Sequence, residues 1–448
     1  MANDQARGAK GDQQLQYELG VAYIKVGDAQ GLPRQPNLGR PKDAIVSYQK
    51  AAGILGRLEP KARVTRELGR CWVHMATVDH HLGDAKGEET AIGKAIAIGE
   101  RDPVIGGFAY AALGNKEMAA DHIPASLAAH QKSLAFNRKV YETDGGDEAR
   151  RNLTVSLNGS GVAQTRAGDL EGALKSLQEG EKLRRPDQNN TSDLRWMEIL
   201  YQNVGNVLGD PDKPSLERPA EAMDAYRKQF ALAGQLYKTD PSNSTARLDM
   251  LRAYAKLSAM ERDSNPQLAL EYNKKAFELV ASLPEGVEKL FIVAVLEDGL
   301  ASVLKNLGRL EEAHRAIGRS IEAVRKMQGN TANNSSPEEA EQATANNLGD
   351  IQLALGRQDA ALRSYQLALR AAKSGIEGQE ADIWANHALY YCYGRMAHYF
   401  AIKGDGKQAA EWSEKQAAVW RNWNARFIPN PYTLRNEHPA RLSPQKKF

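Results

Sequence analysis

The chain has 448 residues, of which 42% are hydrophobic and 26% charged, and its formal net charge is +3. Its charge is too evenly balanced for the basic field that binds nucleic acid. The first 14 residues lack the apolar core of a signal peptide. The longest apolar run, residues 290–296, is far shorter than the roughly 20 residues that span a bilayer. We therefore expect a cytoplasmic protein with no nucleic-acid or membrane partner.

One pattern recurs along the chain: in its clearest copies an alanine is followed by a tyrosine four positions later and by an alanine three positions after that, and degenerate copies fill the gaps. Its first positions are Ala44, Glu88, Ser126, Ala173, Ala222, Ala269, Ala313, Ala361 and Ala409. They are about 46 residues apart, and a period in this range is typical of a stacked helical array. Each unit of such an array packs only on its neighbours, so we predict one elongated all-α domain.

The predicted elements follow this period. We expect residues 1–12 to be flexible, residues 13–427 to form about nine helix-turn-helix units, and residues 428–448 to form a basic tail. In each unit, apolar residues at three- and four-residue spacing predict a helix A and a helix B with one buried face each.

Glycine-containing turns are predicted between the two helices. A Gly-Asp or Gly-Arg pair, such as Gly27-Asp28, fits there because glycine readily takes the left-handed conformation that ends a helix. The aspartate or the residues just after it can cap helix B. Longer breaks rich in proline, glycine or polar residues are predicted at 28–41, 210–219 and 330–337.

The chain holds no glycine-rich loop with the spacing that nucleotide phosphates require. Gly159 and Gly161 lack the third glycine of a dinucleotide loop and follow a helical pattern rather than a strand. Residues 87–94 are one residue too long for a P-loop and lack its magnesium-binding hydroxyl. We interpret both segments as helices with closely packed glycines.

One cluster of histidine and acidic residues has metal-binding side chains but the wrong spacing. It consists of His74, Asp79, His80 and His81. His74 and His81 are about two helical turns apart, or roughly 10 Å of rise, which is too far for one metal ion. We interpret these as surface or inter-helix histidines and predict no metal, no cofactor and no enzymatic activity.

The repeat units resemble a tetratricopeptide repeat (TPR) array. Residues 19–51 hold the pattern with an insertion, and residues 348–368 hold it without one. More narrowly, residues 23–51 and 236–251 are similar to the repeat region on the C-terminal side of many bacterial serine/threonine protein kinases. The resemblance covers residues 13–427 and implies a right-handed α-solenoid that serves as a non-enzymatic protein-protein interaction scaffold. The alternative is a regulatory module of such a kinase, as a fragment or a companion without the catalytic domain.

In TPR arrays the A helices line a concave groove, and matching their small residues to this chain selects seven groove candidates. They are Tyr17, Asn158, Asp298, Lys305, Asn346, Asp350 and His398. An asparagine can hydrogen-bond an extended backbone through donor and acceptor together, so a protein or peptide segment is the expected partner. Equally, each side chain could merely solvate an open groove.

The last predicted helix carries an aromatic stripe. It consists of Trp412, Trp420, Trp423 and Phe427. In one interpretation the stripe is a capping core over which Tyr432 and the tail fold. In the other it mediates self-association into a homodimer, because exposed apolar patches mark interfaces.

Overall fold

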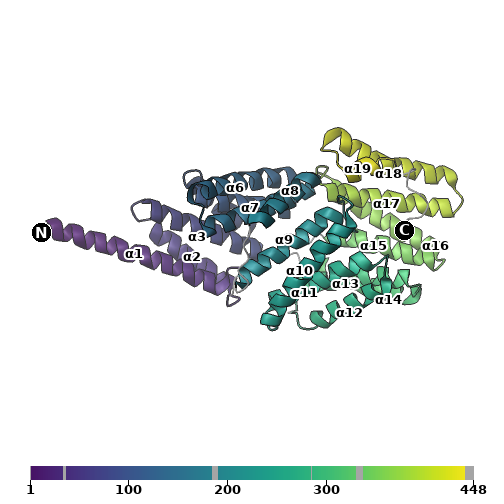
Figure 1. The fold of residues 1–448 in the computed structure, drawn as a ribbon, viewed down its shortest axis with the longest axis horizontal. Helices are drawn as coiled ribbons and strands as arrows, with labels where there is room; N and C mark the ends of the chain where they lie inside the picture. Colours follow the sequence, from purple (N-terminus) through teal and green to yellow (C-terminus); the bar gives the residue numbers. More distant parts are fainter. Residues whose placement is uncertain (1, 34–36, 184–189, 284, 329–336, 439–448) are drawn as a thin grey trace. The chain divides into compact units, whose positions relative to one another are not determined.

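The computed structural model describes residues 2–33, 37–183, 190–283, 285–328 and 337–438, and every regular element in them is a helix (Figure 1). The A helices are α1 (Ala2–Gly31), α3 (Ala62–Leu82), α5 (Pro103–Ala119), α7 (Asp147–Arg166), α9 (Thr191–Gly209), α11 (Ser244–Glu261), α13 (Val287–Asn306), α15 (Pro337–Ala354) and α17 (Ile383–Ile402). The B helices are α2 (Pro41–Leu55), α4 (Ala85–Gly99), α6 (Ile123–Asp144), α8 (Leu170–Leu183), α10 (Pro219–Thr239), α12 (Pro266–Val280), α14 (Leu310–Gln328), α16 (Gln358–Ile376) and α18 (Gly406–Arg426), with α19 (Pro431–Asn436) after them. The prediction of an all-α solenoid of about nine helix pairs is confirmed over these described residues.

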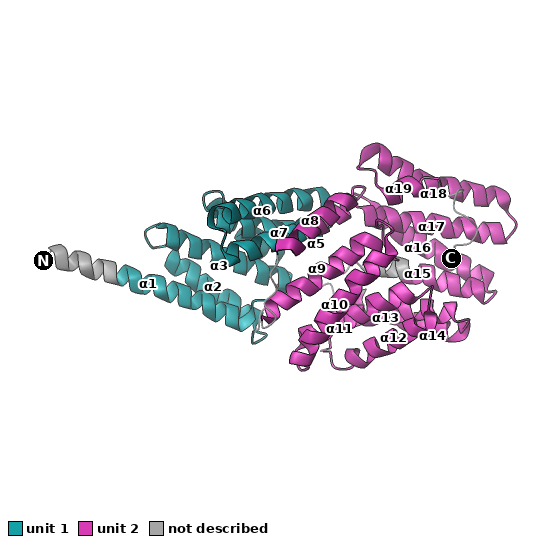
Figure 2. Cartoon of the chain, viewed as in Figure 1, with its two compact units in different colours: residues 1–160 teal, residues 161–448 magenta. Residues whose placement is uncertain are grey.

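The chain divides into two compact units, residues 1–160 (unit 1) and residues 161–448 (unit 2), shown in Figure 2. The division falls inside α7. Helix α1 begins at Ala2, within the segment expected to be flexible, and α19 lies in the segment expected to be a basic tail. The break predicted at 330–337 lies almost wholly outside the described residues. In the part of the chain that the structure describes, no helix combines the length and the apolar composition needed to cross a bilayer.

The recurring small residues mark the places where helix A and helix B approach closely. Those with no exposed surface are Ala44, Ser126, Ala173, Ala222, Ala269, Ala313 and Ala361. In three pairs the helix-B aromatic is a tyrosine whose ring lies against a glycine of helix A. These contacts are Tyr48 with Gly27, Tyr226 with Gly205, and Tyr365 with Gly349. A Cβ atom on any of the three glycines would stand 2.4 to 2.6 Å from the ring, so this approach requires glycine.

The first helix A ends later than its sequence predicts. The Gly27-Asp28 pair predicts a turn, but α1 continues to Gly31. Gly27 lies in the interior of the helix because the Tyr48 ring packs on it. Asp28 does not cap helix B; its carboxylate instead accepts a hydrogen bond from the Tyr48 hydroxyl at 2.7 Å.

Other glycine turns form as predicted. The glycines at the ends of these A helices have φ angles between 73° and 81°, which is the left-handed conformation. They are Gly83, Gly168, Gly308, Gly356 and Gly404. Three aspartates that follow such glycines accept a hydrogen bond from the backbone N–H three residues ahead, at 2.9 to 3.0 Å. These helix-B caps are Asp84, Asp169 and Asp405.

Unit 2 packs its last helices against its first ones. Trp420 and Trp423 of α18 are at most 1% exposed and share a core with residues of α8 and α9. The Tyr432 ring of α19 stands edge-on to Trp420, with 5.5 Å between ring centroids. A Cβ atom on Gly168, in the turn after α7, would lie 2.5 Å from the Trp423 ring, so this turn and α18 are in direct contact.

The aromatic stripe is therefore largely inside unit 2. Its other two members are half-buried: Trp412 lies beside Tyr393, with ring centroids 5.8 Å apart, and Phe427 lies against Trp423 at 4.6 Å. Of the four residues predicted for self-association, Trp412 and Phe427 are the ones that keep exposed surface for a second copy of the chain.

Candidate functional site

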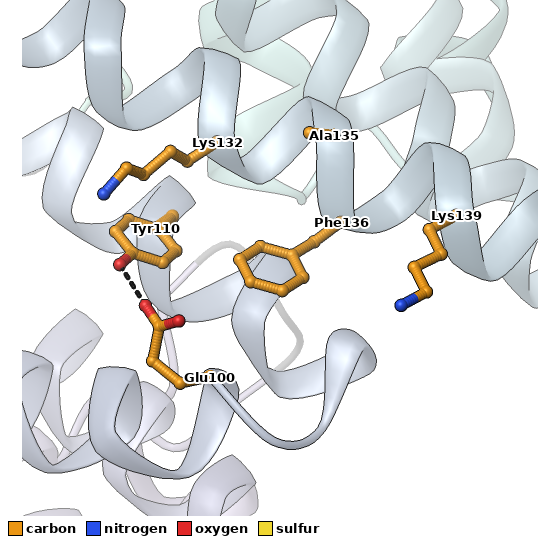
Figure 3. A pocket seen from close by; sticks show the side chains of 6 residues that line it. All are labelled: Glu100, Tyr110, Lys132, Ala135, Phe136 and Lys139. Carbon is orange, nitrogen blue, oxygen red and sulfur yellow. Dashed lines mark hydrogen bonds between the residues drawn. The ribbon is translucent and has the colours of Figure 1, made fainter.

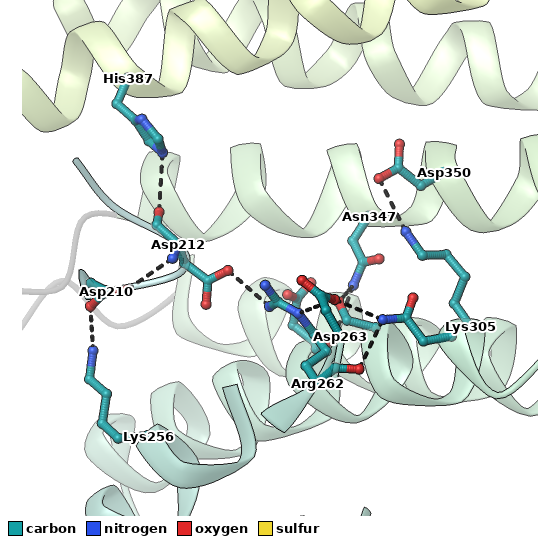
Figure 4. A network of polar contacts seen from close by, with 12 residues as sticks. Asp210, Asp212, Lys256, Arg262, Asp263, Lys305, Asn347, Asp350 and His387 are labelled. Carbon is teal, nitrogen blue, oxygen red and sulfur yellow. Dashed lines mark hydrogen bonds and ion pairs between the residues drawn. The ribbon is translucent and has the colours of Figure 1, made fainter. Parts of the chain in front are cut away.

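Polar side chains connect neighbouring A helices of unit 2 from α9 to α17, and we call them the A-helix network (Figure 4). Its members are Asp210, Asp212, Lys256, Arg262, Asp263, Asp298, Lys305, Asn347, Asp350, His387 and Arg395. Because helix A recurs with the repeat, groups at the same level of adjacent helices are separated by about one period of sequence. One such contact joins Lys256 Nζ to Asp210 at 2.6 Å.

The loop between α9 and α10 supplies two acids to this network. The Asp210 carboxylate accepts a hydrogen bond from the backbone N–H of Asp212 at 2.9 Å, which shapes the start of the loop. Asp212 in turn accepts a hydrogen bond from Arg262, just past the end of α11, at 2.9 Å. Arg262 also lies 3.5 Å from Asp263. One guanidinium is therefore shared by two carboxylates.

Asp350 of α15 is held by three partners. Arg395 Nη2 donates to its carboxylate at 3.0 Å, and Lys305 Nζ lies 3.6 Å away. The Tyr365 hydroxyl donates to it at 2.9 Å. Burial would raise the pKa of Asp350, but Arg395 and Lys305 hold the pKa below its ordinary value. This carboxylate is ionised and its acceptor positions are used.

Asp298 of α13 differs because one of its oxygens is unused. Its Oδ1 atom is buried and has no hydrogen-bond partner. The Asn347 side chain donates to the main-chain oxygen of Asp298 at 3.0 Å. Burial, together with nearby Asp212, raises the pKa of Asp298 to about 6, although a hydrogen bond from the Asn347 side chain acts to lower it. A buried acceptor without a partner costs roughly 1–3 kcal/mol. Oδ1 is therefore an unsatisfied acceptor in a network whose other groups are paired.

His387 of α17 joins the network to the end of the chain. Its Nε2 lies 3.1 Å from the main-chain oxygen of Asp212, and its Nδ1 lies 2.9 Å from the Tyr432 hydroxyl. The carbonyl oxygen can only accept, so Nε2 carries the proton and Nδ1 accepts from the hydroxyl. Burial lowers the pKa of His387 to about 3, which keeps the ring neutral.

Comparisons with known proteins resolve the fold class. No family model matches the chain, and no curated protein matches its sequence. The structure of a Rap protein complexed with competence and sporulation factor is 11% identical, covers 93% of this chain and 99% of its own, and has a TM-score of 0.56. The Rap conjugation gene regulator of plasmid pLS20 in complex with the Phr* peptide is 12% identical, with the same coverage and a TM-score of 0.49. NprR in complex with its cognate peptide NprX is 13% identical, covers 83% of this chain and 96% of its own, and also has a TM-score of 0.49.

This chain has the fold of a TPR-like α-solenoid. At such low identity the likeness concerns the fold alone. It supports the TPR-like repeat class expected from the sequence, whereas the similarity to kinase repeat regions gains no support from it.

Three of the seven predicted groove residues come together in the A-helix network of the solenoid. They are Asp298, Lys305 and Asp350. Asn346 is in the same unit but only 3% exposed, and its Nδ2 donates to the sulfur of Cys392 at 3.3 Å. His398 is half-buried in α17, where burial lowers its pKa. Asn158 lies on α7 in unit 1, where it is half-buried.

Tyr17 was selected by an alignment of helix α1 that the structure does not support. Its selection equates Gly20 with Gly349, but Gly27 is the glycine of α1 that faces the helix-B tyrosine as Gly349 does. The register is therefore shifted by seven residues. Tyr17 lies half-buried on α1, with the Arg63 guanidinium 4.5 Å from its ring centroid.

Several members of the network are absent from the sequence-based candidates. They are Asp210, Asp212, Lys256, Arg262, Asp263, Asn347, His387 and Arg395. The sequence does contain a pattern that indicates these contacts, because opposite charges lie one repeat period apart. Lys256 follows Asp210 by 46 residues, and Arg395 follows Asp350 by 45. Pairing charges across one period would have found these contacts without coordinates.

The histidine cluster of unit 1 forms separate contacts with carboxylates. His74 Nδ1 lies 2.7 Å from Asp28 of α1, and His80 Nδ1 lies 2.9 Å from Glu88 of α4. Both are contacts between helices. Among the residues that the structure describes, no three His, Cys, Asp or Glu side chains are grouped as they would need to be to hold a metal ion.

Proposed function

We propose that unit 2 is a non-enzymatic interaction module that binds a protein or peptide segment along the A-helix network. The observation that carries this proposal is the buried, unpartnered Oδ1 of Asp298. Buried polar atoms in native proteins almost always have a hydrogen-bond partner, so one that does not calls for an explanation. A bound segment that supplies an N–H donor would complete the network.

The surrounding charges favour a donor group. Asp298 Oδ1 is itself an acceptor, and the A-helix network as a whole holds five carboxylates against four cationic side chains. An amide or a cationic group would be attracted there, whereas a carboxylate would be repelled. The Rap protein of similar fold is complexed with competence and sporulation factor, which supports a comparable use of the fold in this chain.

A paired substitution tests this assignment. The double variant Asp298→Asn, Lys305→Gln removes one acid and one base from the network, while Asp350 keeps its contact with Arg395. Full-length chains are used to capture partners from extracts of the source cells, and the affinity for each identified partner is then measured with purified components. We expect the double variant to bind the unit 2 partner at least about tenfold more weakly, because truncating a central contact residue commonly costs more than 1 kcal/mol.

A matched variant controls for the change in charge. Glu271 and Lys274 are exposed on α12 and outside the network, so Glu271→Gln, Lys274→Gln makes the same chemical change elsewhere. This control should bind as the unchanged chain does. Equal binding by all three proteins, each shown to be folded by circular dichroism, would exclude the A-helix network as the binding surface.

A regulatory module of a bacterial serine/threonine protein kinase is the second candidate. Residues 23–51 and 236–251 favour it, through their similarity to the repeat regions of such kinases. Such a module would have a serine/threonine kinase domain encoded in frame with it or recovered as its partner. A gene without such a domain, together with a partner set that contains no kinase, would contradict this candidate.

A further inference from the structure

A lysine covers an aromatic ring at the same position of all three helix pairs of unit 1. The lysine lies on helix B, six residues after the first position of the repeat pattern, and the ring lies on helix A. Lys50 Nζ is 5.6 Å from the centroid of the Tyr23 ring, Lys94 Nζ is 4.0 Å from that of Trp72, and Lys132 Nζ is 4.8 Å from that of Tyr110. Because these pairs pack in order from α1 to α6, the three contacts form one row. We call it the aromatic–lysine row.

The lysines of this row have no carboxylate partner. None of the three forms an ion pair within the described residues, and all three are exposed. Residues three and four positions away on the same helices are uncharged, so no neighbour on the helix neutralises them. Packing of the lysine stem on a ring leaves the ammonium group in water and gives it a preferred direction.

The equivalent cations of unit 2 are mostly neutralised. Lys228 lies 3.7 Å from Glu181, Lys275 lies 3.4 Å from Glu278, and Arg319 lies 2.6 Å from Glu297. The same repeat position thus carries internal ion pairs in three helix pairs of unit 2 and open cations in every pair of unit 1. A cation that only stabilises the helix pair could do so with or without an ion pair. The open cations of unit 1 leave room for carboxylates from another molecule.

The third contact of the row opens into a pocket of about 350 Å³ (Figure 3). Lys132, Phe136 and Lys139 line it from successive turns of α6, and Tyr110 lines it from α5. The Tyr110 and Phe136 rings are stacked, with centroids 5.8 Å apart and 13° between their planes. The pocket therefore has an apolar floor between two ammonium groups. The one carboxylate that lines it, Glu100, already accepts a hydrogen bond from the Tyr110 hydroxyl.

We propose that the aromatic–lysine row of unit 1 is a docking surface for an extended acidic segment of a partner protein. Its Asp or Glu carboxylates would pair with the three lysines of the row. Its apolar side chains would rest on the half-buried rings of Tyr23, Trp72 and Phe136. Unit 1 carries 21 basic and 19 acidic side chains, a net charge of +2. Nucleic acid and anionic membranes bind through extended basic fields, whereas a few open lysines in a nearly neutral unit fit a short acidic peptide. This surface is independent of the function proposed for unit 2.

A defined probe tests the proposal with the full-length chain. The probe is a fluorescein-labelled peptide of alternating Glu and Ala, about 12 residues or roughly 40 Å long when extended, and its counterpart has Gln in place of Glu. We expect fluorescence anisotropy to show binding of the Glu peptide but not of the Gln peptide, and the binding should weaken as salt is added. Trp72 is the only tryptophan of residues 1–160, so the change of tryptophan emission on binding should disappear in Trp72→Phe.

Charge reversal locates the surface. Lys50→Glu, Lys94→Glu, Lys132→Glu should weaken binding of the Glu peptide at least about tenfold, since each change replaces an attraction by a repulsion. The matched variant Lys25→Glu, Lys42→Glu, Lys86→Glu changes three exposed lysines of unit 1 outside the row and should stay within about threefold of the unchanged chain. The proposal is overturned by equal binding of the Glu and Gln peptides, or by equal losses in the two triple variants. It is also overturned if DNA or phosphatidylserine vesicles bind through the row more tightly than the peptide does.

Discussion

A buried carboxylate oxygen without a donor destabilises the folded chain, and Asp298 has one. Replacing this residue by the neutral Asn should therefore stabilise unit 2 at pH 8. The pKa of Asp298 is raised to about 6, above the roughly 3.9 of an unfolded chain, so the unfolded state loses this proton first as pH rises. Folding becomes less favourable between these pKa values, and the penalty is complete above pH 6. We expect Asp298→Asn to gain about 1–2 kcal/mol at pH 8 in urea unfolding.

The pH dependence of this gain separates charge from packing. Most of the gain should be lost as pH falls from 6 to 4, and the rest should disappear near pH 3, where the carboxyl group is largely protonated in both states. Asp359→Asn, an exposed aspartate of α16, should show no comparable gain at either pH. A gain that is the same at pH 4 and pH 8 would contradict the assignment of a buried charge. Stabilisation combined with weaker partner binding is the pattern expected of a residue kept for function.

At the scale of helices, one contact recurs where glycine and tyrosine meet. The residue after the helix-A glycine accepts a hydrogen bond from the helix-B tyrosine hydroxyl at 2.7 to 2.9 Å. The three cases are Asp28 with Tyr48, Asn206 with Tyr226, and Asp350 with Tyr365. In the first and third, the acid also contacts a nitrogen-bearing side chain of the next A helix, His74 or Arg395. This shared geometry gives Asp350 a role in joining helices, so a contact with a partner would be an additional role.

The glycine of this contact can be tested with alanine. Gly205→Ala in α9 would place its Cβ 2.6 Å from the Tyr226 ring. The ring is fully buried and its hydroxyl is held by Asn206, so it has no easy way to move. We expect a loss of about 1–3 kcal/mol in the free energy of unfolding, the usual range for overpacking. Thermal and urea unfolding of unit 2, followed by its tryptophans, would measure it.

A second glycine gives the opposite expectation. Gly234 lies in the interior of α10, and a Cβ atom there would meet nothing within 4 Å. Gly234→Ala should stabilise the chain by about 0.5–1 kcal/mol through helix propensity alone. If both substitutions stabilise the chain, the close approach at Gly205 is not required.

At the scale of the whole molecule, the repeat period predicts the helix pairs because local patterns decide them. The small positions such as Ala44 and the tyrosines such as Tyr48 act within one pair, and their spacing is visible in the sequence. The packing of Trp423 on Gly168 joins residues more than 200 positions apart, and no local pattern in the sequence predicts such a contact. For a similar reason, the sequence predicts only part of the A-helix network. Matching to the repeat found Asp298, while its loop partner Asp212 lies in an insertion that the repeat does not describe.

One of the contacts between the two ends of unit 2 is made by the imidazole ring of His387. His387 of α17 joins the main chain at Asp212, in the α9–α10 loop, to the Tyr432 hydroxyl of α19. Protonation would require Nδ1 to donate, so the ring and the hydroxyl could keep their contact only if the hydroxyl turned to accept. Protonation would also place a positive charge in a buried site and near Lys213. These two effects lower the pKa of His387.

Acid should therefore weaken unit 2 through His387. Its pKa is about 3 in the folded chain and near 6.5 in the unfolded chain, so the unfolded state binds the proton first as pH falls. The stabilisation is complete above pH 6.5 and is lost progressively down to pH 3, with about 2 kcal/mol lost by pH 5. His387→Gln should be less stable than the unchanged chain at pH 8, but its free energy of unfolding should fall less between pH 8 and pH 5. Urea unfolding followed by tryptophan fluorescence would measure this, because five of the six tryptophans lie in unit 2. His314→Gln, on α14, should retain the pH dependence of the unchanged chain. If His387→Gln and the unchanged chain lose the same stability from pH 8 to pH 5, His387 is not the cause of the pH dependence of unit 2.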